Sequence, residues 1–353
     1  MIYQILISIL LALTGCSGTG NAGESPGAGD VIVPNPPVPT PTPAPPKDRP
    51  TAAFHMPAIA APQISDNVAF ESLGPWTLDA GDHEQGERRL ENNYLFLKGG
   101  DAADFHLHDI EARNHGPLLR GSHMPGVVVE RIAVTDGRRS PTYGIGIATL
   151  SNGIGHAVFR DLSYIGDLSS PADNSNDAWA AIALKGKNAN DTGTFVIDRF
   201  DFRNLFMAEG DNYRNADGIS VERGYSGTIT NGRVMNASDA CLDIKGDVRI
   251  DNVQIAGCRE GLKAWSDQHH GVMEIGTNEI AAIIGKGTSA GPRTMTIDVL
   301  IVDGNPKVPL FRAEDGVFNL RIGTLIAAPN QVIRDKDSYP HSRVDIGKRI
   351  RVR

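Results

Sequence analysis

Two aspartates and a lysine lie close together in the stretch "SDACLDIKG", which runs from Ser238 to Gly246. Asp239 and Asp243 lie four residues apart, and Lys245 follows in a strand-like apolar context that ends at a glycine. Crowded carboxylates repel one another unless a cation, a proton or a basic side chain lies between them. The stretch therefore predicts either a cation site or an ion-paired surface, and the segments that stack on it must decide between the two.

Strand-like segments recur along the chain from about residue 105. Segments such as "FHLHDIEA", "AVFRDLSY" and "VRIDNVQIAG" alternate apolar and polar residues around a central polar pair, which is a strand pattern. Matching positions, such as Asn231 with Asn252 and Leu242 with Leu262, recur about 20 residues apart. This period predicts an all-β solenoid, and a right-handed parallel β-helix fits it best. A β-sandwich is the alternative, but it would not keep the strand triplets in frame.

Three successive repeats place polar side chains in columns when they are aligned on their inward-facing residues. With Ile219, Leu242 and Leu262 facing the core, alternation puts Ser220, Asp243 and Lys263 one above another on the outer face. Around this column we expect further acids, bases and an aromatic ring, namely Asp217, Glu222, Arg223, Asp239, Lys245, Arg259, Glu260 and Trp265.

Such a patch has two physical interpretations. Ca²⁺ takes about six to eight oxygen ligands in irregular geometry, and Asp217, Asp239 and Asp243 could supply part of that shell. Alternatively, Asp243 pairs with Lys263 of the next coil as a structural contact. Stacking alone favours neither interpretation.

The order of "ADG", "SD" with a later aspartate, and "GLK" resembles pectate lyases of the parallel β-helix type, in particular polysaccharide lyase family 9. The likeness covers about residues 211–266. Asp217 matches the family's Asp-Gly, Asp239 and Asp243 match the outer aspartates of its SDDGxD motif, and Lys263 matches the lysine of its GFK motif. The resemblance implies a Ca²⁺ ion on the three aspartates and Lys263 as the catalytic base.

Two positions depart from the family pattern. Ala240 stands where the family has a further calcium-binding aspartate, and Cys241 replaces a glycine. The stretch "NSND" at 174–177 is similar to the Asn-x-Asp of β-helix glycoside hydrolases. The paired aspartates and the Gly-His-Gly that accompany it there are missing, so we favour elimination over hydrolysis.

The resemblance implies a polysaccharide lyase that acts on a uronic-acid-containing polymer by β-elimination. A base removes the proton α to the carboxylate, and a cation stabilises the charge that develops there. The base must be neutral, so a nearby cation would have to lower the pKa of Lys263. We expect Arg223, Lys245 and Arg259 to bind the acidic polysaccharide, and Trp265 to stack on a sugar ring. A uronate epimerase would share the proton abstraction, and a carbohydrate-binding or structural β-helix is the non-catalytic alternative.

Histidines and a second tryptophan are weaker candidates. His106 and His108 in "FHLH" lie on one predicted strand face and could bind a metal, although a solvated face is the simpler interpretation. His269 and His270 follow the lysine repeat, and Trp179 could extend a sugar-binding platform.

The N-terminus predicts export. "ILISILLALTGC" is too short to span a bilayer permanently and is typical of a secretory signal. "LTGC" resembles the lipobox of bacterial lipoproteins, which implies a signal peptide at 1–15, a lipidated Cys16 and, because Ser17 is not aspartate, an outer-membrane location facing the periplasm or the cell surface. The segment "MIYQ" before the apolar run carries no lysine or arginine. Residues 16–50 are rich in proline and predict a disordered tether.

Composition sets the remaining limits. The chain has 353 residues and a net charge of −8, which excludes nucleic-acid binding through a basic surface. We expect an N-terminal cap at 51–104, a β-helix domain at 105–353 and a monomer. Cys241 and Cys258 could form a disulfide in an exported protein or remain free thiols, and the sequence leaves both open.

Overall fold

The computed structural model describes residues 54–100, 104–138, 140, 142–168, 179–186, 191–206 and 215–352. The predicted signal peptide, Cys16, the tether and the "NSND" stretch at 174–177 lie outside these residues. The described residues form strands and turns, without a helix. Accordingly, no helix within these ranges has the length and apolar character to cross a membrane.

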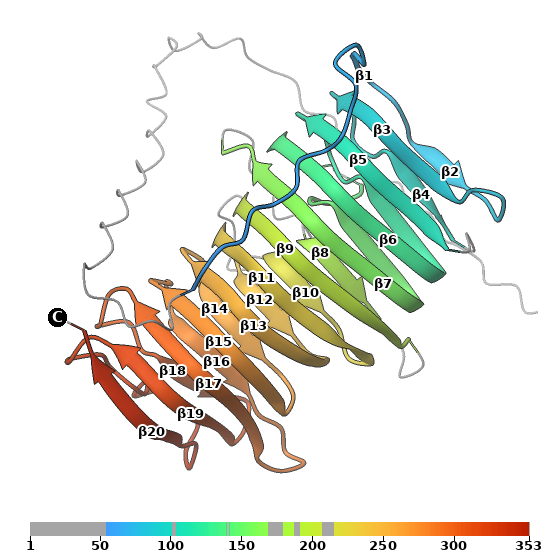
Figure 1. Cartoon of the computed structure of the whole chain (residues 1–353). Helices are drawn as coiled ribbons and strands as arrows, with labels where there is room; N and C mark the ends of the chain where they lie inside the picture. The colour runs from blue at the N-terminus through green and yellow to red at the C-terminus, as the bar shows by residue number, and fades with distance from the viewer. Residues whose placement is uncertain are drawn as a thin grey trace, which may run out of the picture. The chain divides into compact units, whose positions relative to one another are not determined.

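Twenty strands form one continuous sheet in the described part of the chain, and every pairing between them is parallel (Figure 1). In chain order they are β1 (Phe70–Glu71), β2 (Trp76–Leu78), β3 (Glu84–Glu91), β4 (Leu97–Gly100), β5 (Phe105–Arg113), β6 (Leu119–Gly137), β7 (Ala148–Gly166), β8 (Trp179–Lys185), β9 (Gly193–Leu205), β10 (Ala216–Val221), β11 (Tyr225–Ala237), β12 (Ala240–Ile244), β13 (Asp247–Ala256), β14 (Glu260–Ala264), β15 (Gln268–Gly276), β16 (Ala281–Lys286), β17 (Arg293–Asp303), β18 (Phe311–Glu314), β19 (Phe318–Ala327) and β20 (Val344–Arg351).

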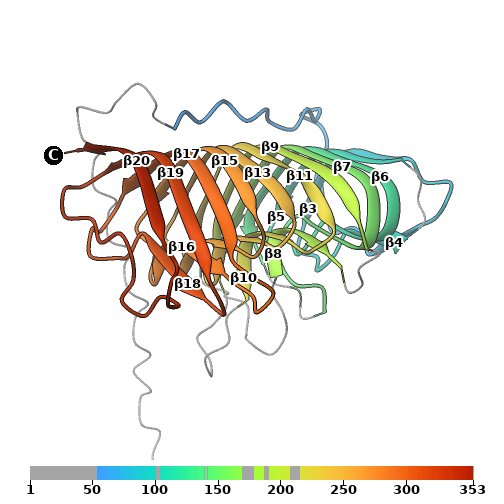
Figure 2. The same ribbon diagram turned by 90° about the horizontal axis from the view of Figure 1, so that it is seen from below.

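Short and long strands alternate along the chain, and each pairs with its own kind in the next coil. The short strands β8, β10, β12, β14, β16 and β18 stack in this order, as do the long strands β9, β11, β13, β15, β17 and β19. Figure 2 shows the short strands β8, β10, β16 and β18 on a different side of the coils from the upper edge, where the long strands lie. The fold is the predicted right-handed parallel β-helix.

The central polar pair of each repeat marks a bend in the long strand. In six successive coils the second residue of the pair has a positive φ: Asp109 (50°), Arg131 (51°), Asp161 (56°), Arg199 (52°), Asn231 (56°) and Asn252 (53°). Aspartate and asparagine tolerate this region, whereas arginine does so at a cost. Both arginines make paired hydrogen bonds to the acid one coil earlier: Arg131 to Asp109 at 2.8 and 2.8 Å, and Arg199 to Asp161 at 2.8 and 2.7 Å. These bonds offset the backbone strain.

The core runs the length of the coils and is filled by the inward-facing side chains. Ile219, Leu242, Leu262, Ile283 and Phe311 succeed one another in register in the short-strand stack, and all are fully buried. Each such side chain stabilises the fold by about 1.5–3 kcal/mol. Removal of one to alanine would cost about 2–5 kcal/mol, because the stacked neighbours limit collapse of the cavity.

The region predicted as an N-terminal cap has two parts. Residues 54–68 lie across the long strands (Figure 1), where the backbone N–H groups of His55, Ala60 and Gln63 donate to Asn252, Asp161 and Asp109 respectively. We call this segment the strap. Strand β3 then pairs with β5 in continuous parallel register, so the solenoid begins before the predicted boundary at residue 105.

Two further features stabilise the solenoid, a disulfide between coils and a charged edge strand at the C-terminal end. Cys241 of β12 and Cys258, which lies just before β14, form a disulfide between adjacent coils. The structure thus selects the disulfide over the free thiols that the sequence left open. At the C-terminus β17, β19 and β20 complete the last coils as predicted, and β20 exposes Lys348, Arg349 and Arg351 at the sheet edge. Charged side chains on an edge strand discourage pairing with another chain.

Candidate functional site

The three short strands β10, β12 and β14 bring the predicted residues into one column. Ser220 pairs with Asp243, and Asp243 pairs with Lys263, in continuous parallel register. The predicted alignment of the three repeats is confirmed. We use the term acid–lysine cluster for the side chains that gather around this column: Asp217, Glu222, Asp239, Asp243, Lys245, Arg259, Glu260, Lys263 and Trp265.

The carboxylates of the cluster are far less exposed than an outer face suggested. Asp217, Asp239 and Asp243 are only 2%, 7% and 8% exposed. Their oxygens find local partners: Asp217 Oδ1 accepts the N–H of Ala240 at 3.0 Å, and Asp243 Oδ1 accepts the indole N–H of Trp265 at 2.7 Å. Hydrogen bonds to N–H groups offset part of the cost of burying a carboxylate.

Three cationic side chains lie among these acids. Lys263 Nζ lies 3.0 Å from Glu260 Oε2 and 3.6 Å from Asp239 Oδ2. Arg259 reaches the other oxygen of Asp239 at 3.6 Å. The predicted partner of Lys263, Asp243, lies in the adjacent register position, but the ammonium turns to the acids beside it.

Lys245 extends from the end of β12 toward two acids. Its Nζ lies 2.6 Å from Glu222 Oε1 and 3.7 Å from Asp243 Oδ2. Arg223, by contrast, lies exposed in the turn after β10 and forms no ion pair with the described residues of the cluster. Of the four predicted substrate-binding residues, Lys245, Arg259 and Trp265 therefore lie at the cluster, and Arg223 lies beside it in a turn.

The indole ring of Trp265 lies between two lysines of different coils. Nζ of Lys245 and Nζ of Lys286 each lie 5.4 Å from the ring centroid, a distance that permits cation–π attraction. Lys286 was missed from the sequence because the alignment stopped at the third repeat. In the next repeat Ala264 pairs with Gly285. The same register therefore places Lys286 next to Trp265.

Burial and mutual repulsion raise the pKa values of the three aspartates in the cluster. The pKa of Asp217 is raised well above its usual value, first by burial and then by the nearby charges of Asp243 and Asp239. Burial likewise raises the pKa values of Asp239 and Asp243, even though Lys263 and Lys245 respectively counteract it. Among the described residues no cation forms an ion pair with Asp217, which agrees with the strong rise of its pKa.

The pKa values of Lys263 and Lys245 are raised, which keeps both side chains charged. Burial opposes the charge of Lys263, but Asp239, Glu260 and Asp243 together raise its pKa above the usual value. The pKa of Lys245 is raised in the same way, against burial, by Asp243 and Glu222. In this arrangement Lys263 is a cation, whereas the base that the resemblance implies must be neutral.

The predicted calcium ligands do not converge on one point in this arrangement. Among the described residues, the group of histidine, cysteine or acidic side chains whose ligand atoms all lie within 4.8 Å of one another is Glu84, His106 and His108. Asp217, Asp239 and Asp243 do not meet this criterion, and their charge is already balanced in part by lysine and arginine. A Ca²⁺ ion on these three aspartates would require the side chains to rearrange.

The two histidines after the lysine repeat take different positions. His270 is fully buried, and its Nδ1 accepts the N–H of Ile250 at 3.2 Å. Burial, with a smaller contribution from His269, lowers the pKa of His270 to about 3, so it is a neutral core residue. His269 is exposed and its Nε2 lies 2.7 Å from Asp298. Neither belongs to the acid–lysine cluster.

Comparisons with known proteins return no match: no protein family, no curated protein and no solved structure matches this chain. The resemblance to pectate lyases therefore rests on the motif residues alone and stays a prediction. A function for the cluster has to be argued from its own chemistry.

Proposed function

We propose that the protein cleaves a uronic-acid-containing polysaccharide by β-elimination at the acid–lysine cluster. The observation that carries the proposal is the stacking of Asp243 and Lys263 in register, with Arg259 and Lys245 beside them. Cationic groups held on a rigid sheet suit a substrate whose carboxylates repeat along a polymer.

The cations would act on the carboxylate of the sugar that reacts. Removal of the proton α to this carboxylate leaves charge on its oxygens, and a lysine or arginine close to them lowers the barrier. The electron pair then forms the ring double bond and expels the glycosidic oxygen, which takes up a proton. Arg259, whose side chain is 34% exposed, is the cation of the cluster most open to such a substrate.

Lys263 is the base that the motif suggests, and its ion pairs define what must happen first. The ammonium has to lose its proton, which Asp239 and Glu260 oppose at 3.6 and 3.0 Å. Substrate binding would have to move Asp239 and Glu260 away from Lys263 or neutralise their negative charge. We derive no step through calcium, because the three aspartates do not converge.

Hydrolysis is a second candidate, and one observation favours it. The pKa of Asp217 is raised well above the usual value, by burial and by its acidic neighbours, while Asp239 lies beside Lys263 and Arg259. A carboxyl group with a raised pKa suits the general acid of glycoside hydrolysis, and the positive charges of Lys263 and Arg259 favour the ionised form of Asp239, the second carboxyl group.

The experiment is incubation with a panel of uronate polymers, monitored in two ways. Elimination gives an unsaturated sugar that absorbs in the ultraviolet, and hydrolysis gives new reducing ends without that absorbance. We expect Lys263→Ala to abolish the unsaturated product while polymer binding persists, since the change removes a role in the transition state. Full turnover by Lys263→Ala would rule out this residue as the base. Reducing ends that form without the ultraviolet absorbance, and that are lost in Asp217→Asn, would favour hydrolysis instead.

Two further outcomes separate the alternatives. Exchange of the α-proton with solvent without chain cleavage would indicate an epimerase. Binding of a uronate polymer without any product would indicate a carbohydrate-binding protein.

We also propose that Cys16 anchors the chain to the outer membrane through its lipid, whichever of these functions the protein has.

A further inference from the structure

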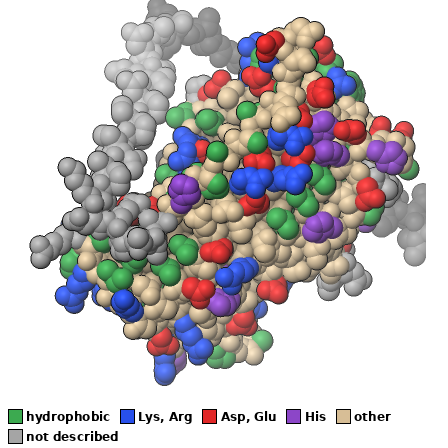
Figure 3. All heavy atoms as spheres, viewed as in Figure 1, with side chains coloured by type: hydrophobic (Ala, Val, Ile, Leu, Met, Phe, Trp, Pro, Cys, Tyr) green, Lys and Arg blue, Asp and Glu red, His purple; other side chains and the backbone are tan. Residues whose placement is uncertain are grey.

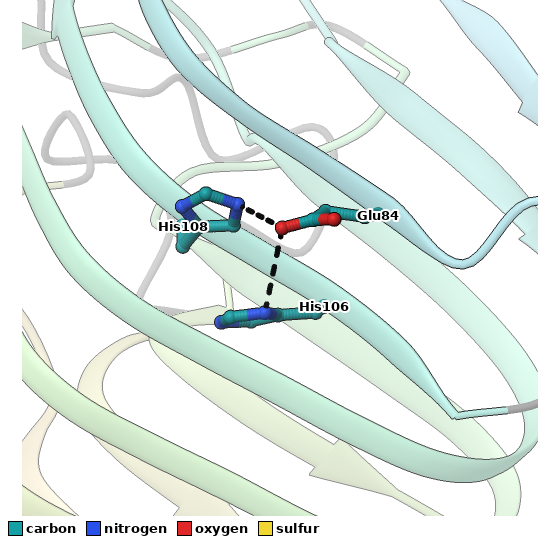
Figure 4. Close-up of side chains that lie close together, drawn as sticks. All are labelled: Glu84, His106 and His108. Atoms are coloured by element: carbon teal, nitrogen blue, oxygen red, sulfur yellow. Dashed lines mark hydrogen bonds and ion pairs between the residues drawn. The ribbon is translucent and has the colours of Figure 1, made fainter. Parts of the chain in front are cut away.

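Glu84, His106 and His108 meet on the outer face of the first long strands, in a part of the solenoid separate from the acid–lysine cluster. Glu84 of β3 pairs with His106 of β5, and Gly86 pairs with His108, so the three side chains alternate onto one face. Figure 4 shows both imidazole rings directed at the Glu84 carboxylate. Figure 3, in the view of Figure 1, shows histidine, basic and acidic side chains gathered over the N-terminal coils.

A glycine makes room for one of the rings. A Cβ atom on Gly86 would lie 2.4 Å from the His108 ring, which is far inside van der Waals contact. The ring therefore rests on the bare backbone of β3, and its centroid lies 4.4 Å from that of His106. Only a small residue at position 86 permits this close approach of the two histidines to Glu84.

Each histidine has a carboxylate behind it, on the ring nitrogen away from Glu84. Nδ1 of His108 lies 2.7 Å from Asp109 Oδ2, and Nε2 of His106 lies 3.3 Å from Glu130 Oε1. We assign the ring hydrogens to the nitrogens that face Asp109 and Glu130, because these two carboxylates are buried whereas Glu84 is exposed. The lone pairs of His108 Nε2 and His106 Nδ1 are then left facing Glu84. Carboxylates behind histidines orient metal ligands in this way.

The two rear carboxylates are themselves fixed. Asp109 is 4% exposed and accepts paired hydrogen bonds from Arg131 at 2.8 and 2.8 Å, together with the N–H of Gln63 at 2.7 Å. Glu130 is 3% exposed and is held by Arg131 and Arg160. With these partners in place, neither carboxylate is free to turn toward the site, and the two rings are held in orientation.

Among the described residues, the basic side chains that pair with Glu84 are the two histidines. His108 Nε2 lies 2.6 Å from Glu84 Oε1, and His106 Nδ1 lies 3.9 Å from the same oxygen. With the ring hydrogens committed to Asp109 and Glu130, these contacts bring lone pairs together. A positive species between the three atoms removes the conflict, and a metal ion does so with one charge centre.

We propose that Glu84 Oε1, His106 Nδ1 and His108 Nε2 bind one divalent first-row transition-metal ion of the Zn²⁺ class. Bonds of about 2.0–2.1 Å place tetrahedral ligands roughly 3.3 Å apart, between the two separations in the structure. Two imidazoles and one carboxylate suit zinc and its neighbours, whereas Ca²⁺ selects oxygen ligands.

Exposure leaves part of the coordination shell open. The side chains of Glu84, His106 and His108 are 63%, 34% and 12% exposed. Three protein ligands facing solvent leave at least one position for water or another small ligand, as in metal sites that act on a bound molecule. The metal site includes no residue of the acid–lysine cluster. Its test is therefore independent of the test of the proposed function.

The test is titration of the full chain, prepared without a polyhistidine tag, with Zn²⁺ in a calorimeter and with Co²⁺ followed by visible absorbance. We expect one tight ion per chain, no competition from Ca²⁺, and Co²⁺ bands that Zn²⁺ abolishes. Glu84→Gln, His106→Ala and His108→Ala should each weaken binding at least about 100-fold. Gly86→Ala should weaken it about 10-fold, because the His108 ring must move.

His269→Ala is the matched control, since His269 is an exposed histidine beside the carboxylate of Asp298, while its neighbour His270 is buried and accepts the N–H of Ile250. It should bind Zn²⁺ like the wild type. The proposal is overturned if neither metal binds, if Ca²⁺ displaces Zn²⁺, or if the His106 and His108 variants bind as tightly as the wild type. The first result would mean that a protonated histidine alone pairs with Glu84, and the last would mean that the metal binds elsewhere on the chain. Should Gly86→Ala fail to fold, the surface histidine variants and the Co²⁺ spectrum still decide.

Discussion

The ammonium group of Lys263 lies 3.0 Å from the carboxylate of Glu260, three residues earlier in the same strand. Residues three apart face opposite sides of a regular strand, so the pair departs from strict alternation at Glu260, the first residue of β14. With exposed fractions of 14% and 7%, the two side chains are mostly withdrawn from water. An ion pair in this position depends strongly on both partners.

Lys263→Ala should lower the free energy of unfolding by about 2 kcal/mol, because it leaves Glu260 without the cation that pairs with it and leaves Asp239 with Arg259 alone. Urea denaturation measures the change. Lys98→Ala is the matched control: Lys98 occupies the same outward column some coils earlier, through Arg120, Thr149 and Ala183, but is exposed. An exposed lysine contributes little, so this control should lie within about 0.5 kcal/mol of the wild type. Equal effects of the two changes would contradict a role for the ion pair.

The raised pKa of Asp217 predicts that this residue lowers the free energy of unfolding as pH rises. In the unfolded chain Asp217 loses its proton near the ordinary value of about 3.9. Between that pH and the raised folded value, the folded state binds more protons than the unfolded one, so the free energy of unfolding falls with rising pH. Asp217→Asn keeps an acceptor for the Ala240 N–H and carries no charge. Relative to this variant, the wild type should lose up to about 1.4 kcal/mol per pH unit.

Denaturation of both proteins from about pH 4 to about pH 7 checks this sign. The two should be equally stable at the acidic end, and the variant should be the more stable at the neutral end. Asp345→Asn, in the exposed edge strand β20, is the control and should follow the wild type throughout. A wild type that gains stability over Asp217→Asn as pH rises would show that Asp217 is ionised and paired in the fold.

The alternation of apolar and polar residues predicted the fold and the register of β10, β12 and β14, because both depend on inward-facing positions. Ile219, Leu242 and Leu262 stack as expected, and Ser220, Asp243 and Lys263 follow with them. Register also explains the central polar pair, although its role as a left-handed bend was not predicted. An arginine at position 131 does not by itself predict a positive φ. This conformation depends on the hydrogen bonds of Arg131 to Asp109 one coil earlier.

The contacts of the site could not be predicted in the same way. Register places Cα atoms, but the exposure of Asp217 and the direction of the Lys263 ammonium depend on packing around them. Contacts distant in sequence carry no periodic signal either. The strap residue His55 meets Asn252 across 197 positions, and nothing in the repeat points to that pairing.

Reduction of the disulfide between Cys241 and Cys258 should destabilise the protein by about 3 kcal/mol, as expected for a link that closes a loop of 17 residues. Denaturation with and without reductant measures this difference. A variant with both cysteines replaced by alanine should be insensitive to reductant. Alkylation of Cys241 and Cys258 in unfolded protein that had not been reduced would contradict the link.

The lipobox-like "LTGC" predicts that Cys16 holds the protein on the membrane. Cys16→Ser should move the protein from the membrane fraction to the soluble fraction, because acyl chains supply the membrane affinity of such an anchor. Ser17→Ala leaves the cysteine intact and should stay with the membrane. Unchanged partitioning of Cys16→Ser would mean that another feature holds the chain there.

At one end of the strap, the backbone of His55 forms two hydrogen bonds with the side chain of Asn252. The backbone N–H of His55 donates to its Oδ1 at 3.2 Å, and its Nδ2 donates to the His55 carbonyl at 2.9 Å. Asn252 has a φ of 53°, so a change to alanine would mix side-chain loss with backbone strain. Glycine adopts this conformation readily, and Asn252→Gly therefore removes the side-chain contacts alone.

Asn252→Gly should speed hydrogen exchange at His55 and its neighbours, because local opening of the strap no longer breaks those two bonds. Exchange at Gln63, held by Asp109 at 2.7 Å in an earlier coil, should be unaffected. Asn236→Gly is the matched control: Asn236 also has a positive φ, of 62°, and donates to Asn204, but it does not contact the described part of the strap. Both variants lose an asparagine from a stacked row, so both should lose similar stability, about 1 kcal/mol. Only Asn252→Gly should loosen His55, and an equal loosening in Asn236→Gly would mean that the strap follows the global stability of the coils rather than this contact.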